Sequence, residues 1–361
     1  MPNARSASAC DSQILNLRIP PFDHAVADAA RTRWNSVAKP IGSLGLLEDA
    51  VTQIALVTGD LDVDISRRCV AVLCADNGVV AEGVSQSTHE VTTTVANNIA
   101  RGRSSVCLMC RPFGIDCMAV DLGMVCPPGA DGVLDRRIAA GTGNIAQGPA
   151  MTREQAARAI MVGVDLVEGL KRQGYGIIAT GEMGIGNTTT ATAMACAFLE
   201  GDPKALTTRG AGLSDEGLRR KEEAIARALE INKPFTDDPL DVLSKVGGFD
   251  IAGMCGMFLG GAVHRVPVIV DGLISVVAAF CAWRLKPECV NAMIASHVSS
   301  EPAAGLMLDQ MGLRAPLHAG MRLGEGTGAA SLIPLLDMAV SLYREGTTFE
   351  ACGMAPYEVR P

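Results

Sequence analysis

Two glycine-rich segments that each carry a glutamate are the chemically most informative parts of the sequence. The first, Gly181-Glu-Met-Gly-Ile-Gly-Asn-Thr-Thr-Thr190, follows a short apolar run and opens an alanine-rich helix that includes Ala191–Ala197. Glycines before a helix let backbone N–H groups approach a phosphate, and the helix dipole favours its negative charge. The segment matches neither a P-loop nor the GxGxxG pattern, so ATP or a dinucleotide is not indicated. It predicts a phosphate site with Glu182 beside it.

The second segment, Leu323-Gly-Glu-Gly-Thr-Gly328, also precedes a helix. Glycines on both sides leave the Glu325 carboxylate unshielded, so a ligand can come close. A glutamate is also favourable at a helix N-terminus, so this segment alone fits capping as well as catalysis. Together with Glu182 it predicts two carboxylates in one crevice, which suits proton transfer or stabilisation of a cationic transition state.

Other polar residues give weaker signals. Lys221 follows Arg209-Gly-Ala-Gly212 on a helix, where a solvated lysine and a phosphate ligand are both consistent with the pattern. The five histidines show no metal-like spacing, and His297 is interpreted as a satisfied turn residue. Cys107-x-x-Cys110 lacks two further ligands at comparable spacing and is interpreted as structural. The sequence therefore predicts neither a metal nor a cofactor.

Short Val/Ile-rich runs alternate with longer helical patterns after about residue 61. Such runs are typical of strands buried on both faces, and the alternation predicts a Rossmann-like α/β domain with a parallel sheet flanked by helices. The capping box Thr152-x-x-Gln155 predicts a helix to about Gly174, and another helix is expected from near Ser214 to just before Asn232. The predicted strands are Cys69–Cys74, Ile115–Leu122, Gly176–Thr180, Val266–Val270 and Val290–Ala295.

Each predicted strand ends in a small, polar or acidic cluster. In an open parallel sheet all carboxyl ends lie at one edge, and ligands bind in the crevice there. The sequence therefore predicts an active site at this edge. The clusters are Asp76-Asn-Gly78, Asp121-Leu-Gly123, Gly181-Glu-Met-Gly184, Asp271-Gly272 and Ser296-His through Glu301.

The two ends of the chain have helical patterns. Ser43, in Lys39-Pro-Ile-Gly-Ser-Leu-Gly45, is expected to cap the leucine-rich helix that follows it, and a last helix is expected over Leu332–Tyr343. We predict that residues 1–60 and 335–361 form a small helical domain beside a large α/β catalytic domain of residues 61–334.

Composition excludes several classes of partner. Hydrophobic residues make up 48% and charged residues 19%, which predicts a sizeable core, and the net charge of -8 argues against a nucleic-acid partner. The N-terminus has no apolar signal segment, and the longest apolar run, Val266–Trp283, is interrupted by Asp271. The twelve cysteines fall mostly in apolar stretches, as is typical of a reducing compartment. We expect a cytoplasmic protein with no membrane or nucleic-acid partner.

Glycines that can hold a phosphate and unshielded carboxylates fit ribosyl transfer from a mononucleotide. In that reaction the leaving group departs from C1 of the ribose with oxocarbenium character, and a base removes a proton from the incoming nucleophile. The residues by themselves fit a glycoside-type hydrolysis nearly as well.

The motifs as a set strongly resemble those of the nicotinate-nucleotide–dimethylbenzimidazole phosphoribosyltransferases of cobalamin synthesis. The resemblance spans about residues 35 to 335 and implies a large α/β domain, a small domain made from both chain ends, and a dimer. The matching segments begin with Lys39-Pro-Ile-Gly-Ser-Leu-Gly and Ala75-Asp-Asn-Gly-Val-Val-Ala-Glu-Gly-Val-Ser, and continue with Gly181-Glu-Met-Gly-Ile-Gly-Asn-Thr-Thr, Arg209-Gly-Ala-Gly-Leu, Gly247-Gly-Phe-Asp-Ile-Ala, Val270-Asp-Gly and Leu323-Gly-Glu-Gly-Thr-Gly-Ala.

The resemblance also implies roles for individual residues. Glu325 resembles the general base that deprotonates the attacking base, and Glu182 the second catalytic carboxylate near the ribose. The implied substrates are nicotinate mononucleotide and an aromatic lower-ligand base. The residues implied for phosphate and ribose are Gly184, Gly186, Asn187, Gly210, Lys221, Asp250, Asp271 and Ser299, and those for the aromatic base are Ser85, Thr94, Met183 and Leu323.

Three departures from the family pattern leave the acceptor base open. Asn77 stands where many members have histidine, Gln86-Ser-Thr-His-Glu90 stands where many have an aromatic residue and proline, and Thr94 stands where relatives place glutamine. Three hypotheses follow: a transferase for benzimidazoles, a relative specialised for phenol or p-cresol that works as a heterodimer with a paralogue, and a catalytically silent partner subunit. The presence of both glutamates argues against the third hypothesis.

Overall fold

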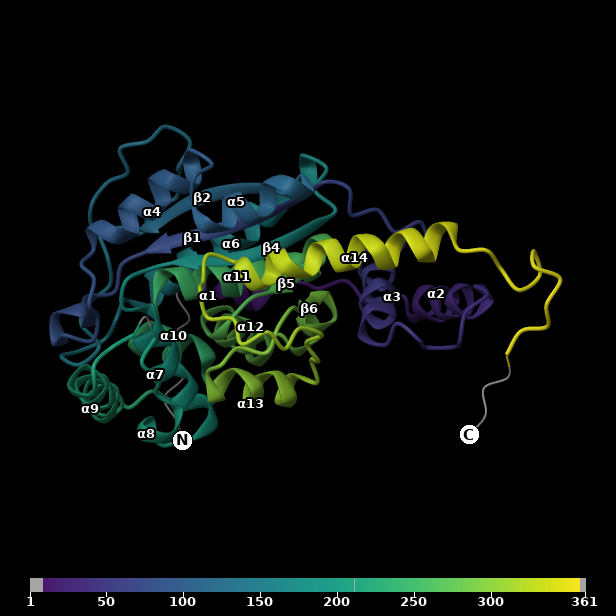
Figure 1. Cartoon of the computed structure of the whole chain (residues 1–361). Coiled ribbons are helices and arrows are strands. Elements are labelled where there is room, and N and C mark those ends of the chain that lie inside the picture. The colour runs from purple at the N-terminus through teal and green to yellow at the C-terminus, as the bar shows by residue number, and fades with distance from the viewer. Residues whose placement is uncertain (1–8, 211, 358–361) are drawn as a thin grey trace.

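A six-stranded parallel sheet forms the centre of the molecule, and its strand order is β3-β2-β1-β4-β5-β6 (Figure 1). The computed structural model describes residues 9–210 and 212–357. This order reverses between β1 and β4, as it does in doubly wound dinucleotide-binding folds. The strands are β1 (Arg68–Ala75), β2 (Asp116–Gly123), β3 (Leu134–Asp135), β4 (Ile177–Met183), β5 (Val268–Val270) and β6 (Met293–Ala295).

The predicted strands are confirmed, with three differences in extent, of which the smallest is that β5 begins at Val268 and not at Val266. β4 runs through Gly181 and Glu182 to Met183, so the predicted phosphate segment begins inside the strand, because those residues pair with β1. The β6 prediction began too early, since residues 290–292 belong to the short 3-10 helix η3 (Pro287–Ala292). The edge strand β3 was not predicted, because two residues carry no periodic signal.

Helices cover both faces of the sheet, and alternate residues of β1 point to opposite faces. Cys69, Ala71 and Leu73 pack in one core cluster, and Val70, Val72 and Cys74 in the other. The first face carries α1 (Ala9–Asn16), α6 (Arg153–Arg172), α7 (Asn187–Leu199), α8 (Pro203–Leu206), α9 (Asp215–Asn232), α10 (Pro239–Val246), α11 (Phe249–His264), α12 (Leu273–Leu285) and α13 (Pro302–Met311). The second face carries α2 (His24–Ser36), α3 (Leu46–Thr58), α4 (Glu90–Ala100), α5 (Ser105–Cys110) and α14 (Thr327–Glu345).

Segments from the two chain ends lie together, since α2 and α3 pack beside the far half of α14 (Figure 1). Trp34 of α2 and Tyr343 of α14 are buried with ring centroids 5.0 Å apart, and Val37 pairs with Thr348. This packing is consistent with the small helical domain of residues 1–60 and 335–361. The division stays a prediction, because α14 runs without a break across its boundary.

Helix starts were predicted with two errors, one of which is the last helix: α14 begins at Thr327 and not at Leu332. Thr152 and Gln155 form the expected capping box of α6, and Ser214 caps α9. Ser43 does not cap α3: the N-cap is Gly45, at φ 55°, where no side chain contributes a bond. Instead the carboxylate of Glu48 accepts the N–H of Leu44 at 2.9 Å and the Lys39 ammonium at 2.7 Å. No helix within residues 9–210 and 212–357 is long and apolar enough to cross a membrane.

Helices α6 and α11 approach so closely that only glycine fits at their crossing. A Cβ at Gly163 would lie 1.9 Å from the backbone oxygen of Gly253, and one at Gly256 would lie 1.8 Å from that of Ile160. Because both obstacles are backbone atoms, they cannot move aside as a flexible side chain would. This crossing fixes α11 under the carboxyl end of the sheet, where its first turn carries Asp250.

Gly163→Ala should therefore lower the free energy of unfolding by about 3 kcal/mol or more, because the added methyl forces the two helices apart. Gly169→Ala on the same helix is the matched control. A Cβ there meets nothing within 4 Å, and helix propensity alone should stabilise it by up to about 1 kcal/mol. Urea unfolding of both variants measures the difference, and equal effects would contradict the close-packing argument.

Candidate active site

A cavity of about 330 Å³ lies at the carboxyl ends of the strands, beside the point where the strand order reverses. Such switch points are where open parallel sheets bind ligands. Nine predicted site residues line the cavity: Glu182, Met183, Gly184, Asn187, Gly210, Asp271, Ser299, Leu323 and Glu325. The cavity is also lined by His297 and Glu301, from the polar cluster predicted at this edge, and by residues without a predicted role, among them Ser87, Val91, Val95 and Arg322.

The loop that carries Glu325 lies directly on β4, and three glycines allow this approach. A Cβ at Gly181 would lie 2.7 Å from the Glu325 backbone oxygen, and one at Gly326 would lie 2.9 Å from that of Thr180. A Cβ at Gly324 would lie 2.8 Å from Oε1 of Glu182. The glycines therefore bring the two predicted carboxylates to one cavity, as the sequence indicated, and they serve close packing as well as backbone freedom.

Glu182 is buried at the end of β4 and shares its surroundings with other acids. Its carboxyl group accepts a hydrogen bond from the side-chain amide of Asn187, and its side chain is only slightly exposed. Burial raises the pKa of Glu182 to about 8, and the nearby negative charge of Asp250 contributes to the rise, while the Asn187 bond opposes the shift. At neutral pH Glu182 therefore carries a proton.

Glu325 occupies a more open position. It is half-buried, and its Oε2 accepts the backbone N–H of Val106, in the first turn of α5, at 3.1 Å. Its φ of 59° lies in the left-handed region, which is uncommon for a residue with a Cβ and is frequent at functional sites. The two glutamates thus differ in environment: one lies in the low-dielectric end of the sheet, and the other is fixed by a backbone donor at the cavity surface.

Asp271 and His297 close the far side of the cavity. Oδ1 of Asp271 accepts the backbone N–H of Ala329 at 2.8 Å and lies 4.0 Å from Nδ1 of His297. Burial raises the pKa of Asp271, and His297 opposes that shift. A Cβ at Gly328 would lie 2.0 Å from Nδ1 of His297, so glycine is required there. His297 is thus held by neighbours, as the sequence interpretation expected.

Lys221 lies directly behind the cavity wall. Its Nζ donates to Oγ1 of Thr188 at 3.0 Å and to the backbone oxygen of Thr208 at 3.2 Å, and a Cβ at Gly210 would lie 3.6 Å from it. The side chain is almost fully buried, and burial lowers its pKa to about 8, with Glu301 opposing the shift. The interpretation of Lys221 as a solvated lysine is therefore wrong. A buried lysine behind Gly210, which has a φ of 53° and no side chain, suits an anion in the cavity.

The predicted base-binding residues separate in the structure. Met183 and Leu323 line the cavity, whereas Ser85 and the phosphate candidate Gly186 line a smaller adjoining cavity of about 90 Å³. Thr94 is exposed and donates to the backbone oxygen of Glu90, so its predicted contact with the base finds no support. Its neighbours on the same helix, at positions 91 and 95, are valines that line the cavity instead. Thr94 thus lies on a helix that lines the cavity, but its own side chain does not line it.

Asp250 and Asn77 lie beneath the cavity and do not line it. Both side chains are fully buried, and Oδ2 of Asp250 accepts the Asn187 amide at 2.9 Å. Asp250 was predicted to bind phosphate or ribose, but Asn187 separates it from the cavity, and it carries the wrong charge for a phosphate. Likewise Asn77 does not reach the base pocket. Only the match to the family pattern, and no spacing rule, could have singled out either residue.

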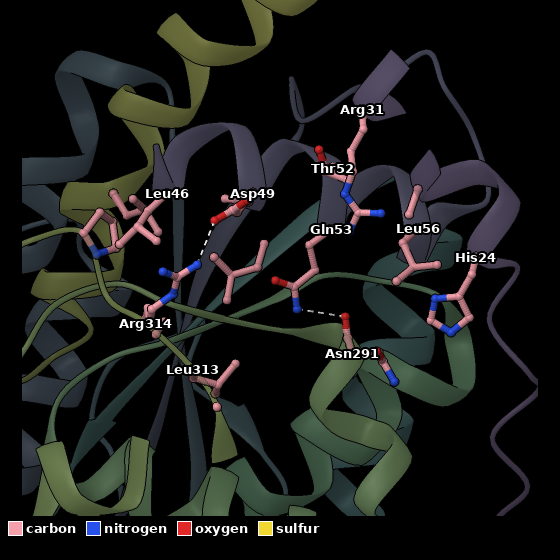
Figure 2. Close-up of a pocket in the computed structure, with 17 residues that line it drawn as sticks. His24, Arg31, Leu46, Asp49, Thr52, Gln53, Leu56, Asn291, Leu313 and Arg314 are labelled. Carbon is pink, nitrogen blue, oxygen red and sulfur yellow. Dashed lines mark hydrogen bonds and ion pairs between the residues drawn. The ribbon is translucent and has the colours of Figure 1, made fainter. Parts of the chain in front are cut away.

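A second cavity, of about 360 Å³, lies between α2, α3 and the end of α13 (Figure 2). It is slightly larger, but its main polar groups already have partners. Arg314 pairs with Asp49 at 3.1 Å, and Gln53 donates to the backbone oxygen of Asn291 at 3.0 Å (Figure 2). Gln53 also donates to the backbone oxygen of Met293, and Arg31 pairs with Asp28 at 2.9 Å. Neither glycine-flanked glutamate lines it, so the cavity at the sheet edge is the candidate active site.

The parallel sheet, the glycine-rich loops and the buried lysine are features compatible with a site for a phosphorylated substrate, and comparisons with known proteins identify the family. Residues 19–354 match the family model described as Phosphoribosyltransferase. The nicotinate-nucleotide–dimethylbenzimidazole phosphoribosyltransferase of Acetivibrio thermocellus is 43% identical over 92% of this chain and 94% of its own length. The enzyme of the same name from Ruminiclostridium cellulolyticum is 44% identical, over 91% and 94%.

Solved structures agree with the sequence comparisons. CobT from Thermus thermophilus matches with a TM-score of 0.86 and 37% identity, covering 92% of this chain and 100% of that one. This protein therefore belongs to the nicotinate-nucleotide–dimethylbenzimidazole phosphoribosyltransferase family. The resemblance, the α/β fold class and the pentosyltransferase class predicted from the sequence are confirmed.

The proton on Glu182 has a consequence for stability. Burial raises its pKa from 4.5 to about 8, so between these values the native protein binds a proton that the unfolded chain releases. Stability from this group therefore falls as pH rises through that window. Glu182→Gln should raise the free energy of unfolding by about 2–4 kcal/mol at pH 8 and by little near pH 4.5.

Urea unfolding of the wild type and of Glu182→Gln at several pH values measures this effect. Glu345→Gln, an exposed change at the end of α14, is the control and should alter stability little at any pH. A gain from Glu182→Gln that is the same at pH 4.5 and pH 8 would show that the group is ionised throughout.

Proposed function

We propose that this protein moves ribose 5-phosphate from nicotinate mononucleotide to 5,6-dimethylbenzimidazole, giving nicotinate and an α-riboside phosphate for the lower ligand of a cobamide. The observation that carries the proposal is a single cavity lined by two glutamates of unlike environment, with a buried lysine behind one wall. Family membership over more than nine-tenths of the chain supports the same reaction.

The nucleotide phosphate is assigned to the side of the cavity next to Lys221. Gly184, Gly210 and Ser299 line this side, and α7 begins there with Asn187. The helix N-terminus and a protonated lysine both favour a phosphate. Because the pKa of Lys221 is lowered to about 8, phosphate affinity should decline as pH rises above that value.

The reaction is a displacement at C1 of the ribose. The bond to the pyridinium nitrogen breaks, nicotinate leaves with the electron pair, and C1 gains oxocarbenium character. A nitrogen of the acceptor attacks C1 from the opposite face, and the acceptor loses a proton. Glu325 is assigned as the base that takes this proton, since it lies at the cavity surface with one oxygen fixed by Val106. Glu182 is assigned to the ribose side.

The acceptor ring is assigned to the apolar part of the cavity. Val91, Val95, Met183 and Leu323 line it, and such side chains suit a flat aromatic bicycle better than a sugar. Hydrolysis, in which water is the acceptor, needs no such wall, so the wall favours transfer over hydrolysis.

The first experiment is to measure nicotinate release when the purified chain meets nicotinate mononucleotide with dimethylbenzimidazole, and separately with phenol. Formation of the benzimidazole riboside phosphate at the higher kcat/KM is the expected result. Preference for phenol would assign the protein to the phenol-specialised branch. No release with either acceptor would contradict the proposal and favour a partner subunit that only completes another chain's site.

Glu325→Gln should lower turnover by about two to four orders of magnitude and leave nucleotide affinity nearly unchanged, because it removes the proton acceptor but keeps the shape of the side chain. Single-turnover kinetics and calorimetric titration with nicotinate mononucleotide measure the two effects. Glu345→Gln serves again as the control. Near-wild-type turnover in Glu325→Gln would refute the role assigned to Glu325.

We also infer that the protein acts in the cytoplasm as a dimer, either of two identical chains or with a paralogue. The family resemblance supports the dimer, and the cysteines in apolar stretches support the cytoplasmic location. The mass of the purified chain in solution, measured by light scattering, tests it: a monomer that turns over at full rate would refute it.

A further inference from the structure

One side-chain amide joins two buried carboxyl groups beneath the candidate active site. Nδ2 of Asn187 donates to Glu182 and also to Oδ2 of Asp250, the latter at 2.9 Å. Glu182 faces the cavity, whereas Asp250 lies behind Asn187 and is fully buried. An amide that donates to two carboxyl groups holds them at a fixed, short distance. Ionisation of one carboxyl group then makes ionisation of the other less favourable, because the two negative charges repel each other.

The hydrogen bond from Asn187 accounts for only one of the two carboxylate oxygens of Asp250. Within residues 9–210 and 212–357 no hydrogen-bond partner of Oδ1 is found, although the side chain is buried. A Cβ at Gly248 would lie 2.5 Å from this oxygen and 2.7 Å from Oδ1 of Asn77, so glycine at 248 leaves room for both. A buried, unpaired carboxylate oxygen costs stability, and a functional role is a common reason for keeping one.

The charged groups that surround the pair are mostly acidic. Around Glu182 and Asp250 lie Asp76 at the end of β1, Asp271 after β5 and Glu325 in the loop before α14, together with the buried thiol of Cys74. In the part of the chain that the structure describes, the basic groups nearby contact other residues: His297 faces Asp271, His89 faces Asp76 at 3.2 Å, and Lys221 is bonded to Thr188 and Thr208.

We propose that Asp250 is a positioning residue for Glu182: through Asn187 it holds the two carboxyl groups as a pair that carries a single proton, with the proton on Glu182. One consequence of this inference rests on the proposed function: the bound anionic nucleotide meets Glu182 as a neutral hydrogen-bond donor. The charge stays on Asp250 because it lies in the first turn of α11, where the helix dipole favours an anion.

The pKa values agree with this division of roles. Burial raises the pKa of Asp250 to about 6, and the hydrogen bond from Asn187 together with the nearby backbone N–H groups of Ile251 and Asp250 limits the shift. Burial raises the pKa of Glu182 to about 8, with the Asp250 charge as the next cause. Between these values the pair bears one negative charge, which limits its repulsion of a bound phosphate.

Infrared spectroscopy of the substrate-free protein tests the proposal without any assumption about the reaction. At pH 7 the wild type should show a protonated-carboxyl band that Glu182→Gln lacks. In Asp250→Asn the loss of the neighbouring charge lets Glu182 ionise at lower pH, so this band should disappear at least one pH unit earlier. Asp337→Asn, which removes a partly exposed partner of Arg68 far from the cavity, is the control and should leave the titration unchanged.

Calorimetric titration with nicotinate mononucleotide supplies the functional readout. Asp250→Asn should weaken binding by about tenfold at pH 7.5 and regain wild-type affinity below pH 6, a recovery that a purely structural defect would not show. In the Asp250→Asn, Glu182→Gln double variant this pH dependence should vanish, and only the decline from Lys221 above pH 8 should remain.

Three results would overturn the proposal: no Glu182 band at pH 7, a band that titrates alike in the wild type and Asp250→Asn, or an affinity loss in Asp250→Asn that is equal at all pH values. If Asp250→Asn does not fold, Glu182→Gln alone decides. The protonated-carboxyl band that this variant lacks must be present in the wild type at pH 7, and its absence would refute a neutral Glu182. Failure of nucleotide binding in the wild type would refute the proposed function but leave the infrared result valid.

Discussion

The close approach of one loop to one strand end creates the active site. The loop that carries Glu325 lies on the carboxyl end of β4, and the glycines at 181, 324 and 326 make room for this contact. Without that contact Glu325 would sit a side chain's width farther from Glu182, and the two carboxyl groups could not share a cavity of this size. Every role assigned to the site depends on this contact, because proton transfer and charge stabilisation both need their groups within a few ångströms of the reacting atoms.

The same contact places chemically identical side chains in different environments. Glu182 ends a strand buried on both faces, and removal of water raises its pKa to about 8. Glu325 lies half-exposed at the cavity, and its carboxylate accepts the backbone N–H of Val106. One residue can therefore donate a hydrogen bond while the other accepts a proton. Such division of labour between two carboxyl groups is a common result of unequal burial.

Beneath the site the protein keeps an excess of buried acid. Glu182, Asp250 and Asp271 all lie where burial raises their pKa values, and the buried lysine nearby is bonded to threonines rather than to any of them. Such a cluster is unfavourable for folding at neutral pH, so its retention is explained by function. The tight crossing of α6 and α11 supplies rigidity here, because it fixes the helix that carries Asp250 against backbone atoms that cannot yield.

The sequence by itself determined the parallel α/β sheet, the sheet edge at which the cavity lies and the two glutamates of the glycine-rich segments. It could do so because burial on both faces, helix capping and glycine before a helix each leave a local pattern. Only the tertiary structure decided which side chains meet. Val91 and Val95 line the cavity, whereas Thr94 does not. Asp250 lies behind Asn187, and Lys221 is buried behind Gly210. These outcomes depend on the rotation of a helix by part of a turn and on the packing of segments far apart in the chain. Residue type and spacing do not encode such relations locally.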